Sequence, residues 1–353
     1  MKSRHTLAAF SAFATIALAV GVFSLVRCGA GSYIADEGQV FGTFYHIKYE
    51  YPRSLQPEIE KRLAAVDASL SPFNAKSIIT AVNNNRDVRV DSMFRTVFGI
   101  AREVSAETGG AFDITVAPLV NLWGFGFSHK DSVSDERVAQ LLRTVGYRGV
   151  ELSPGGRVMK RNPATQLDCS AIAKGYACDV VASLFGSLGI DNYLIEIGGE
   201  IVASGVNEKK APWSVGINRP DDDSTSASVS ASVSAAGVAA VLRLTDCAVA
   251  TSGNYRRFYY RNGRRYAHTI DPRTGYPVQH TLLSSTVIAP DCATADAYAT
   301  AFMVLGIDSA RQVLKRHPEL NACFIYSDHK GEYAVWATPG VAKFMDSGKT
   351  PRK

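Results

Sequence analysis

Residues 167–200, LDCSAIAKGYACDVVASLFGSLGIDNYLIEIGGE, predict a helix followed by a buried strand. The helix runs from about Ala171 to Leu188, and the strand runs from Tyr193 to Ile197 and ends at a pair of glycines. The next predicted strand is Trp213–Ile217, where apolar and small residues alternate with the period of a half-buried strand. Helix and strand in close succession indicate a domain that mixes the two kinds of element.

Amphipathic helices are predicted on both sides of this stretch. Apolar residues recur every three or four positions from Ile59 to Leu70, which is the spacing of one helix face. Asp91 can cap a second helix that stops at Gly109, and Ser134 begins a third. The C-terminal part adds two more helices, Ala293–Leu305, which ends at Gly306, and the residues that follow Asp308.

Short apolar runs predict further strands, several of them in hairpins. These runs are Ala239–Leu244, Arg257–Tyr260, Ser284–Ile288, Ala322–Tyr326 and Tyr333–Trp336. Between two of the strand-like segments, residues 221–237 form a low-complexity stretch of Asp, Ser, Ala and Val, which we interpret as a hairpin insertion. Intermixed helices and hairpins favour an α+β fold with antiparallel sheet, in one domain from residue 31 to residue 345.

The first thirty residues are predicted to be a targeting segment. Lys2 and Arg4 precede an apolar run from Leu7 to Val26, which reaches the length of about 20 residues that spans a bilayer. Two interpretations stay open, an uncleaved membrane anchor and a lipoprotein signal cleaved before Cys28, although Arg27 stands where a lipoprotein signal has a small residue. Both place the body outside the cytoplasm, on the outer face of the cytoplasmic membrane, which is the periplasmic side in a Gram-negative cell.

Composition excludes several classes of function. The 38 basic and 33 acidic residues give a net charge of +5, which is too even for an electrostatic nucleic-acid binder. The six cysteines include no Cys-x-x-Cys pair, which argues against a structural zinc site or a thioredoxin-like redox pair. The sequence also lacks the P-loop, dinucleotide-binding, serine-hydrolase and zinc-protease motifs.

Asp296 and Thr300 form the first candidate site. They lie four residues apart on a predicted helix, so both oxygens project from one face. A carboxylate with a hydroxyl suits a hard cation such as Mg²⁺, whereas a hydrogen bond between the two side chains is the alternative. The alanines on either side, Ala295 and Ala297, favour the metal because an unpaired aspartate in such surroundings needs a partner.

Asp168 and Lys174 flank a turn of small residues that opens the predicted helix of residues 171–188. Backbone N–H groups at a helix start can bind phosphate, and a lysine beside them can neutralise its charge. Alternatively, Asp168 or Ser170 caps the helix and Lys174 lies on the surface. Both interpretations stay open from these residues alone.

His268 lies three residues before Asp271, in a short polar turn bounded by Pro272 and Gly275. A histidine held near a carboxylate can serve as a general base. A structural role is the commoner one for an isolated histidine, but the polar residues that crowd this turn favour a functional role.

Six blocks of small and polar residues follow one another along the chain. They are TGGAFD with PLVNLWGFG (108–126), LDCSAIAKGYA (167–177), EIGGE (196–200), ATSGNYRRF (250–258), AHTIDPRTG (267–275) and DAYATAFMVLG (296–306). In this order the blocks resemble the ApbE family, the FAD:protein FMN transferases. The resemblance begins near Phe41, passes through Leu70–Asn74 and reaches about Gly306. Six ordered blocks are more specific than any single motif.

The resemblance implies a T-fold-related α+β architecture and a Mg²⁺-dependent reaction. FAD is split at its pyrophosphate, FMN is joined by a phosphoester bond to a Thr or Ser of an acceptor protein, and AMP is released. The implied acceptors are subunits of sodium-translocating NADH:quinone reductase, its electron-transport relatives, or exported flavoprotein reductases. Two alternatives stay open: hydrolysis of FAD to FMN and AMP, and an exported FAD-binding protein with a degenerate metal site.

Site residues carry over motif by motif. The metal ligands implied by the resemblance are Asp296, Thr300 and the backbone carbonyl of Ala171, and the implied base is His268. The residues that line the flavin nucleotide are Phe41, Phe73, Ala111, Phe112, Asp113, Asp168, Lys174 and Ile270. Phe73 and Phe112 have aromatic rings that suit a flavin or adenine face. Phe41 departs from the Met of many members, and Phe73 from a common Tyr.

Overall fold

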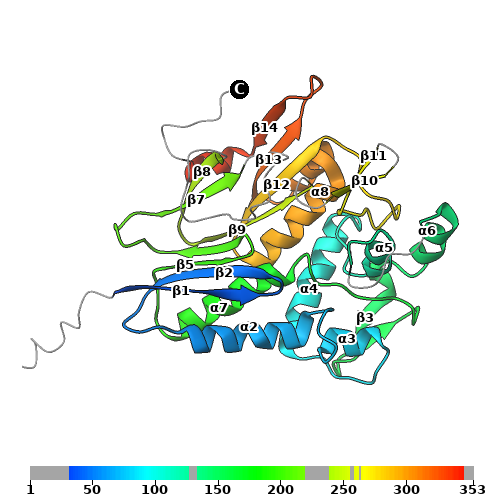
Figure 1. Cartoon of the computed structure of the whole chain (residues 1–353), viewed down its shortest axis with the longest axis horizontal. Coiled ribbons are helices and arrows are strands. Elements are labelled where there is room, and N and C mark those ends of the chain that lie inside the picture. The colour runs from blue at the N-terminus through cyan, green and yellow to red at the C-terminus, as the bar shows by residue number, and fades with distance from the viewer. Residues whose placement is uncertain (1–31, 127–132, 219–237, 255–257, 262–263, 346–353) are drawn as a thin grey trace, which may run out of the picture.

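An eight-stranded antiparallel sheet forms the centre of the molecule (Figure 1). It is seen in a computed structural model that describes residues 32–126, 133–218, 238–254, 258–261 and 264–345. In spatial order the strands are β1 (Tyr33–Val40), β2 (Thr43–Glu50), β5 (Tyr193–Ile197), β6 (Glu200–Ser204), β9 (Cys247–Gly253), β12 (Leu282–Ala289), β13 (Asn321–Ser327) and β14 (Tyr333–Ala337). Every neighbouring pair is antiparallel, which confirms the predicted α+β class.

Helices cover one face of this sheet in two layers. Helices α7 (Ala173–Ser187) and α8 (Cys292–Leu314) pack directly on the strands, and α2 (Gln56–Leu70) and α4 (Ser92–Glu107) pack against them (Figure 1). The predicted periodicity is confirmed because Ile59, Leu63, Val66 and Leu70 of α2 are all buried in the main core. Asp91 caps α4 as predicted, accepting the N–H of Phe94 at 2.8 Å.

The opposite face carries a second, smaller core. The hairpin of β7 (Trp213–Asn218) and β8 (Val238–Leu244) packs there with η2 (Pro339–Phe344), burying Trp213 and Leu242 against the sheet. The low-complexity segment between these two strands lies outside the described residues. The remaining elements are α3 (Ile78–Asn83), α5 (Ala117–Leu122), α6 (Asp135–Leu142), η1 (Tyr147–Gly149), β3 (Val150–Leu152), β4 (Val158–Lys160), β10 (Phe258–Arg261) and β11 (Arg264–Ala267).

Several elements differ from the prediction. Strand β6 comes between the predicted strands Tyr193–Ile197 and Trp213–Ile217, because Gly198 and Gly199 both adopt positive φ and turn the chain straight back. The β1–β2 hairpin was not predicted, and it turns at Phe41 and Gly42, again with positive φ. The two predicted C-terminal helices are confirmed as the halves of α8, which bends at Gly306.

The targeting segment predicted for residues 1–30 lies outside the described residues. Across the part of the chain that is described, no helix combines the length and apolar character needed to cross a bilayer. The five cysteines of that part, Cys169, Cys178, Cys247, Cys292 and Cys323, are buried free thiols.

Candidate active site

A buried charged group lies where α7, α8 and the β5–β6 turn meet. Lys174, in the first turn of α7, forms an ion pair with Glu200, the first residue of β6. The side chain of Lys174 is 30% exposed and that of Glu200 only 5%. Lys174 is therefore half-buried and ion-paired rather than a free surface residue, and its ammonium group is held where β5 turns into β6.

Asp296 of α8 completes this group. It is 3% exposed, and its Oδ2 accepts the N–H of Gly175 at 3.1 Å. Burial raises the pKa of Asp296, and it raises the pKa of Glu200 to about 7 despite the opposing effect of Lys174. Burial alone would lower the pKa of Lys174, but the carboxylates of Glu200 and Asp296 outweigh it and raise the value. Lys174 is thus a permanent cation at neutral pH.

Gly175 allows the two helices to approach closely enough to form this group. A Cβ atom at this position would lie 2.3 Å from the carbonyl oxygen of Cys292 and 2.9 Å from Cβ of Asp296. Asp179, one turn further along α7, accepts the N–H groups of Cys292 and Ala293, each at 2.8 Å. The start of α8 is therefore fixed against α7, which sets the position of Asp296 relative to Lys174.

Thr300 lies one turn after Asp296 and contacts the sheet. Its hydroxyl is 3.1 Å from that of Ser252 on β9. Asp296 is thus bonded to α7 and Thr300 to β9. These partners do not support the alternative of a hydrogen bond between Asp296 and Thr300 within the helix.

The residues near Asp296 fit a hard divalent cation in their chemistry. Asp296, Thr300 and a backbone carbonyl are all oxygen donors, which Mg²⁺ prefers. Beside them, Oε2 of Glu200 is buried and has no hydrogen-bond partner among the described residues. In those residues no group of three or more His, Cys, Asp and Glu side chains is placed to hold a metal. Any cation here would therefore depend on hydroxyl, carbonyl and water or phosphate oxygens as well as Asp296.

The block Thr108–Asp113 forms a buried turn after α4. Asp113 accepts the N–H of Thr115 at 2.8 Å and that of Tyr147 at 2.7 Å, so its carboxylate organises the backbone. Phe112 is 2% exposed and packs in the main core, so its ring offers no free face for a flavin or adenine. Phe73 is 70% exposed, and Phe41 is half-buried in the β1–β2 turn. Phe73 is therefore the better placed of the predicted aromatic rings.

Asp168 connects that block to α7. Its backbone N–H donates to the carbonyl of Ile114 at 2.7 Å, and its Oδ1 accepts the N–H of Ser170 at 2.8 Å. The residue preceding α7 is Ile172, and no side chain caps the helix. The predicted alternative of capping by Asp168 or Ser170 is wrong, and Asp168 instead shapes the turn that contains Ala171.

His268 directly follows β11. Its ring lies edge-on to that of Phe125, with 6.3 Å between the centroids. Asp271 is held by Arg273 through two hydrogen bonds of 2.9 and 2.8 Å, so this carboxylate is already engaged by a guanidinium. Ile270 is buried with Leu119 in a small separate core. A methyl group on Gly110 would lie 3.9 Å from Cγ of Arg273, which brings this segment beside the turn of residues 108–113.

Two residues of the site were not predicted as functional, Glu200 and Ser252. Glu200 stands at the end of EIGGE, and its signal is an acidic residue beside two glycines between apolar strands. Ser252 belongs to ATSGNYRRF, and only the strand register shows that it faces Thr300.

Glu196 should make the stability of the protein depend on pH. It lies between Ile195 and Ile197, which belong to the main core, so it faces the opposite side of β5. Burial first, and the carboxylate of Glu200 second, raise the pKa of Glu196 from 4.5 to about 7. The folded protein holds this proton more tightly than the unfolded chain, so the free energy of unfolding falls as pH rises from 4.5 towards 7.

Glu196→Gln removes this titration. We expect its Tm to exceed that of the parent by about 2–4 °C at pH 8, the shift that roughly 1 kcal/mol produces in a chain of a few hundred residues. At pH 4 the two proteins should unfold together, because both side chains are then neutral. Thermal unfolding at the two pH values measures this, and a difference of equal size at both would contradict it.

Comparison with known proteins places the chain in a family. The ApbE family pattern matches residues 41–324. A protein of Haemophilus influenzae named FAD:protein FMN transferase is 36% identical over 319 residues, which cover 86% of this chain and 89% of that protein. The chain belongs to the ApbE family.

Solved structures agree with this assignment. The flavin transferase ApbE from Vibrio cholerae has a TM-score of 0.79 and 32% identity, covering 89% of this chain and 100% of that one. The apo form of the flavinyl transferase ApbE of Pseudomonas stutzeri has a TM-score of 0.78 and 30% identity, covering 92% and 100%. The family resemblance noted from the sequence is confirmed.

Proposed function

We propose that this protein is an FAD:protein FMN transferase, which cleaves FAD and attaches FMN through a phosphoester to a Thr or Ser of an acceptor protein. The observation that carries the proposal is the Lys174 cation, held against Glu200 and Asp296 at the start of α7. A fixed positive charge at a helix start, where the helix dipole also favours an anion, suits a pyrophosphate. Phosphoryl transfer depends on such positioning and charge neutralisation more than on covalent assistance.

Atoms balance in a single displacement. His268 accepts the proton of the acceptor hydroxyl while the hydroxyl oxygen forms a bond to the phosphorus on the FMN side of the pyrophosphate. The bond from that phosphorus to the bridging oxygen breaks, and AMP leaves with the bridging oxygen. Lys174 stays charged throughout and orients the phosphates.

A Mg²⁺ ion held by Asp296, Thr300 and the carbonyl of Ala171 would neutralise charge on the phosphate oxygens. This part of the proposal is supported by the oxygen-only donor set and by the orphaned Oε2 of Glu200 nearby. Glu200 holds Lys174 in place, and the N–H of Gly175 holds the carboxylate of Asp296.

Intact-mass measurement tests the proposed reaction. The purified chain is incubated with FAD, Mg²⁺ and a subunit of sodium-translocating NADH:quinone reductase, the acceptor that the resemblance implies. The acceptor should gain the mass of one FMN less one water, and one AMP should appear for each modified acceptor. Release of FMN and AMP with an unmodified acceptor would show hydrolysis, and intact FAD would contradict both activities.

We also propose that the body is exported and held on the outer face of the cytoplasmic membrane by residues 1–30. Support comes from the basic residues Lys2 and Arg4 before an apolar run of spanning length.

Deletion of residues 1–30 should release the protein from the membrane fraction with its transfer rate unchanged within about twofold, because the segment is an anchor and not core. Cell fractionation followed by the mass assay measures this. Cys28→Ala separates the two kinds of anchor, since only a lipoprotein loses its lipid mass. A truncated chain that is recovered only as insoluble material would contradict the proposal.

A further inference from the structure

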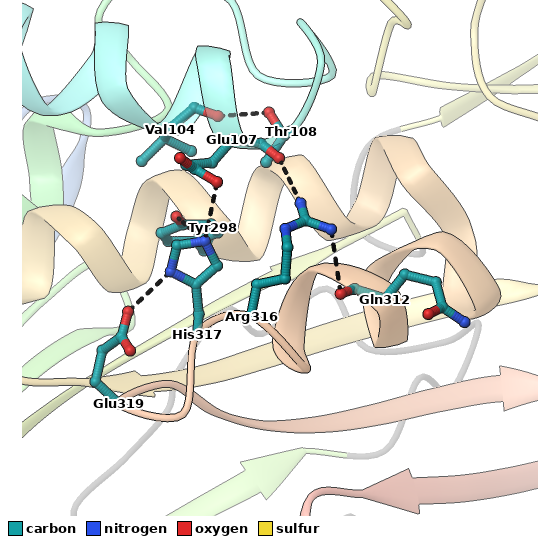
Figure 2. Close-up of polar contacts among 8 residues, drawn as sticks. All are labelled: Val104, Glu107, Thr108, Tyr298, Gln312, Arg316, His317 and Glu319. Atoms are coloured by element: carbon teal, nitrogen blue, oxygen red, sulfur yellow. Dashed lines mark hydrogen bonds and ion pairs between the residues drawn. The ribbon is translucent and has the colours of Figure 1, made fainter.

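The turn that follows α8 contacts the end of α4 through one histidine. Nε2 of His317 lies 3.3 Å from Oε2 of Glu107, the last residue of α4, and Nδ1 lies 2.9 Å from Oε1 of Glu319. The imidazole also packs on the ring of Tyr298, with 5.4 Å between the centroids. Figure 2 shows the imidazole between the two glutamates and beside Tyr298. The side chain is only 17% exposed, so this geometry is held by its surroundings.

The preceding residue makes a second contact with the same helix end. Nη2 of Arg316 donates to the backbone carbonyl of Glu107 at 3.0 Å, and Nη1 donates to the carbonyl of Gln312 at 3.3 Å (Figure 2). The last carbonyls of a helix have no partner within the helix, and a cation there also interacts favourably with the helix dipole. Arg316 and His317 together therefore fix both the backbone and the side chain of Glu107.

The turn beyond Glu107 depends on that helix end. The hydroxyl of Thr108 donates to the carbonyl of Val104 at 2.6 Å and accepts the N–H of Phe112 at 3.3 Å. The N–H of Gly110 donates to the carbonyl of Ser105 at 2.7 Å. A displacement of the last turn of α4 would thus be passed to the turn of residues 108–113, which the family resemblance assigns to the flavin.

Tyr298 extends the connection to α8. It stands between Asp296 and Thr300, and two residues along a helix rotate a side chain by about 200°, to the opposite face. Asp296 and Thr300 accordingly meet α7 and β9, whereas Tyr298 meets His317. The imidazole of His317 therefore links the end of α4, which leads into the turn of residues 108–113, to α8, which carries Asp296 and Thr300. It does so from the face of α8 opposite to Asp296 and Thr300.

We propose that Arg316 and His317 form a clamp that positions the turn of residues 108–113 relative to α8. His317 is then a positioning residue for FAD, an inference that rests on the function proposed above. Without the clamp the turn samples more conformations, and FAD binds only those in the right geometry. The apparent dissociation constant for FAD rises in inverse proportion to the fraction of the protein that keeps the right geometry. The chemical step in bound FAD is unchanged.

Steady-state kinetics of the full chain separate this role from a catalytic one. His317→Ala should raise KM for FAD by about 3–10-fold and leave kcat within about twofold. His317→Gln, which keeps a hydrogen-bond donor, should recover most of the loss. Lys315→Ala is the matched control, because it removes a charge from an exposed neighbour in the same turn. A fall in kcat with KM unchanged would overturn the proposal.

Hydrogen exchange provides a readout that needs no activity. Amides of residues 108–113 should exchange faster in His317→Ala than in the parent, and at the parental rate in Lys315→Ala. If His317→Ala does not fold, Arg316→Lys replaces it, since a lysine cannot reach both carbonyls with a planar fork. Parental exchange in a folded clamp variant overturns the clamp. A parent chain that fails to modify any acceptor overturns the proposed function, and the exchange result is still valid in that case.

Discussion

Asp296→Ala should reduce FMN transfer by about 10³-fold or more, since under the proposed function its carboxylate would hold a divalent cation beside the pyrophosphate, an interaction worth several kcal/mol to the transition state. The protein should remain folded, because the substitution removes a buried carboxylate whose pKa burial has already raised. Thr300→Val should be milder, as a neutral hydroxyl contributes less than a carboxylate. Transfer rates by intact mass, with Tm as the measure of folding, test both variants.

Asp308→Ala is the control for this experiment. Asp308 lies on the same helix but is exposed. Its replacement by alanine changes the net charge as much as Asp296→Ala does, but it removes no residue of the site. Calorimetric titration with Mg²⁺ alone gives a second readout, in which Asp296→Ala should lose binding and Asp308→Ala should keep it. Full transfer activity of Asp296→Ala in Mg²⁺ would remove the metal assignment.

His268→Ala should slow transfer by about 10²–10⁴-fold, the usual range for losing a general base. Its affinity for FAD should change little, because the proposed base would act on the acceptor hydroxyl and not chiefly on the nucleotide. Single-turnover transfer and a separate FAD titration measure the two quantities. His329→Ala, in the exposed turn between β13 and β14, serves as the matched histidine control.

A structural role for His268 predicts a different pattern. Its ring packs near Phe125, so a structural histidine would lower FAD binding, Tm and activity together. A variant that binds FAD normally and cannot modify the acceptor supports the base. An unaltered transfer rate would exclude His268 from the mechanism.

Elements with strong local patterns were predictable from the sequence. The apolar spacing of α2, the cap at Asp91 and the apolar run of β5 each depend on residues within one element, and the structure confirms them. The β1–β2 hairpin was missed, although Tyr45, Ile47 and Tyr49 of β2 alternate with polar residues as in a half-buried strand. Its turn is made by Phe41 in a backbone conformation that non-glycine residues rarely adopt, so no turn motif marks it.

The sequence indicated which residues belong to the site, but not which of them contact one another. Lys174 and Asp296 stand out because charged residues are rare in apolar helices. Their partners, Glu200 and Gly175, come from other elements, and only the packing of α7 on α8 and β6 brings them together. Phe112 shows the converse difficulty: its ring is buried in the main core, and a motif alone does not distinguish a ring that meets a ligand from one that fills the core.

The strand order of the central sheet has a consequence for synthesis. Each strand pairs with the one that precedes it among the eight, from β1–β2 at one edge to β14 at the other. A chain that emerges from its N-terminus can therefore add strands to one growing edge without waiting for later residues. Asp296 arrives only with α8, after six of the eight strands. A nascent chain thus lacks Asp296 until most of the sheet has been synthesised, so the proposed flavin chemistry requires a nearly complete chain.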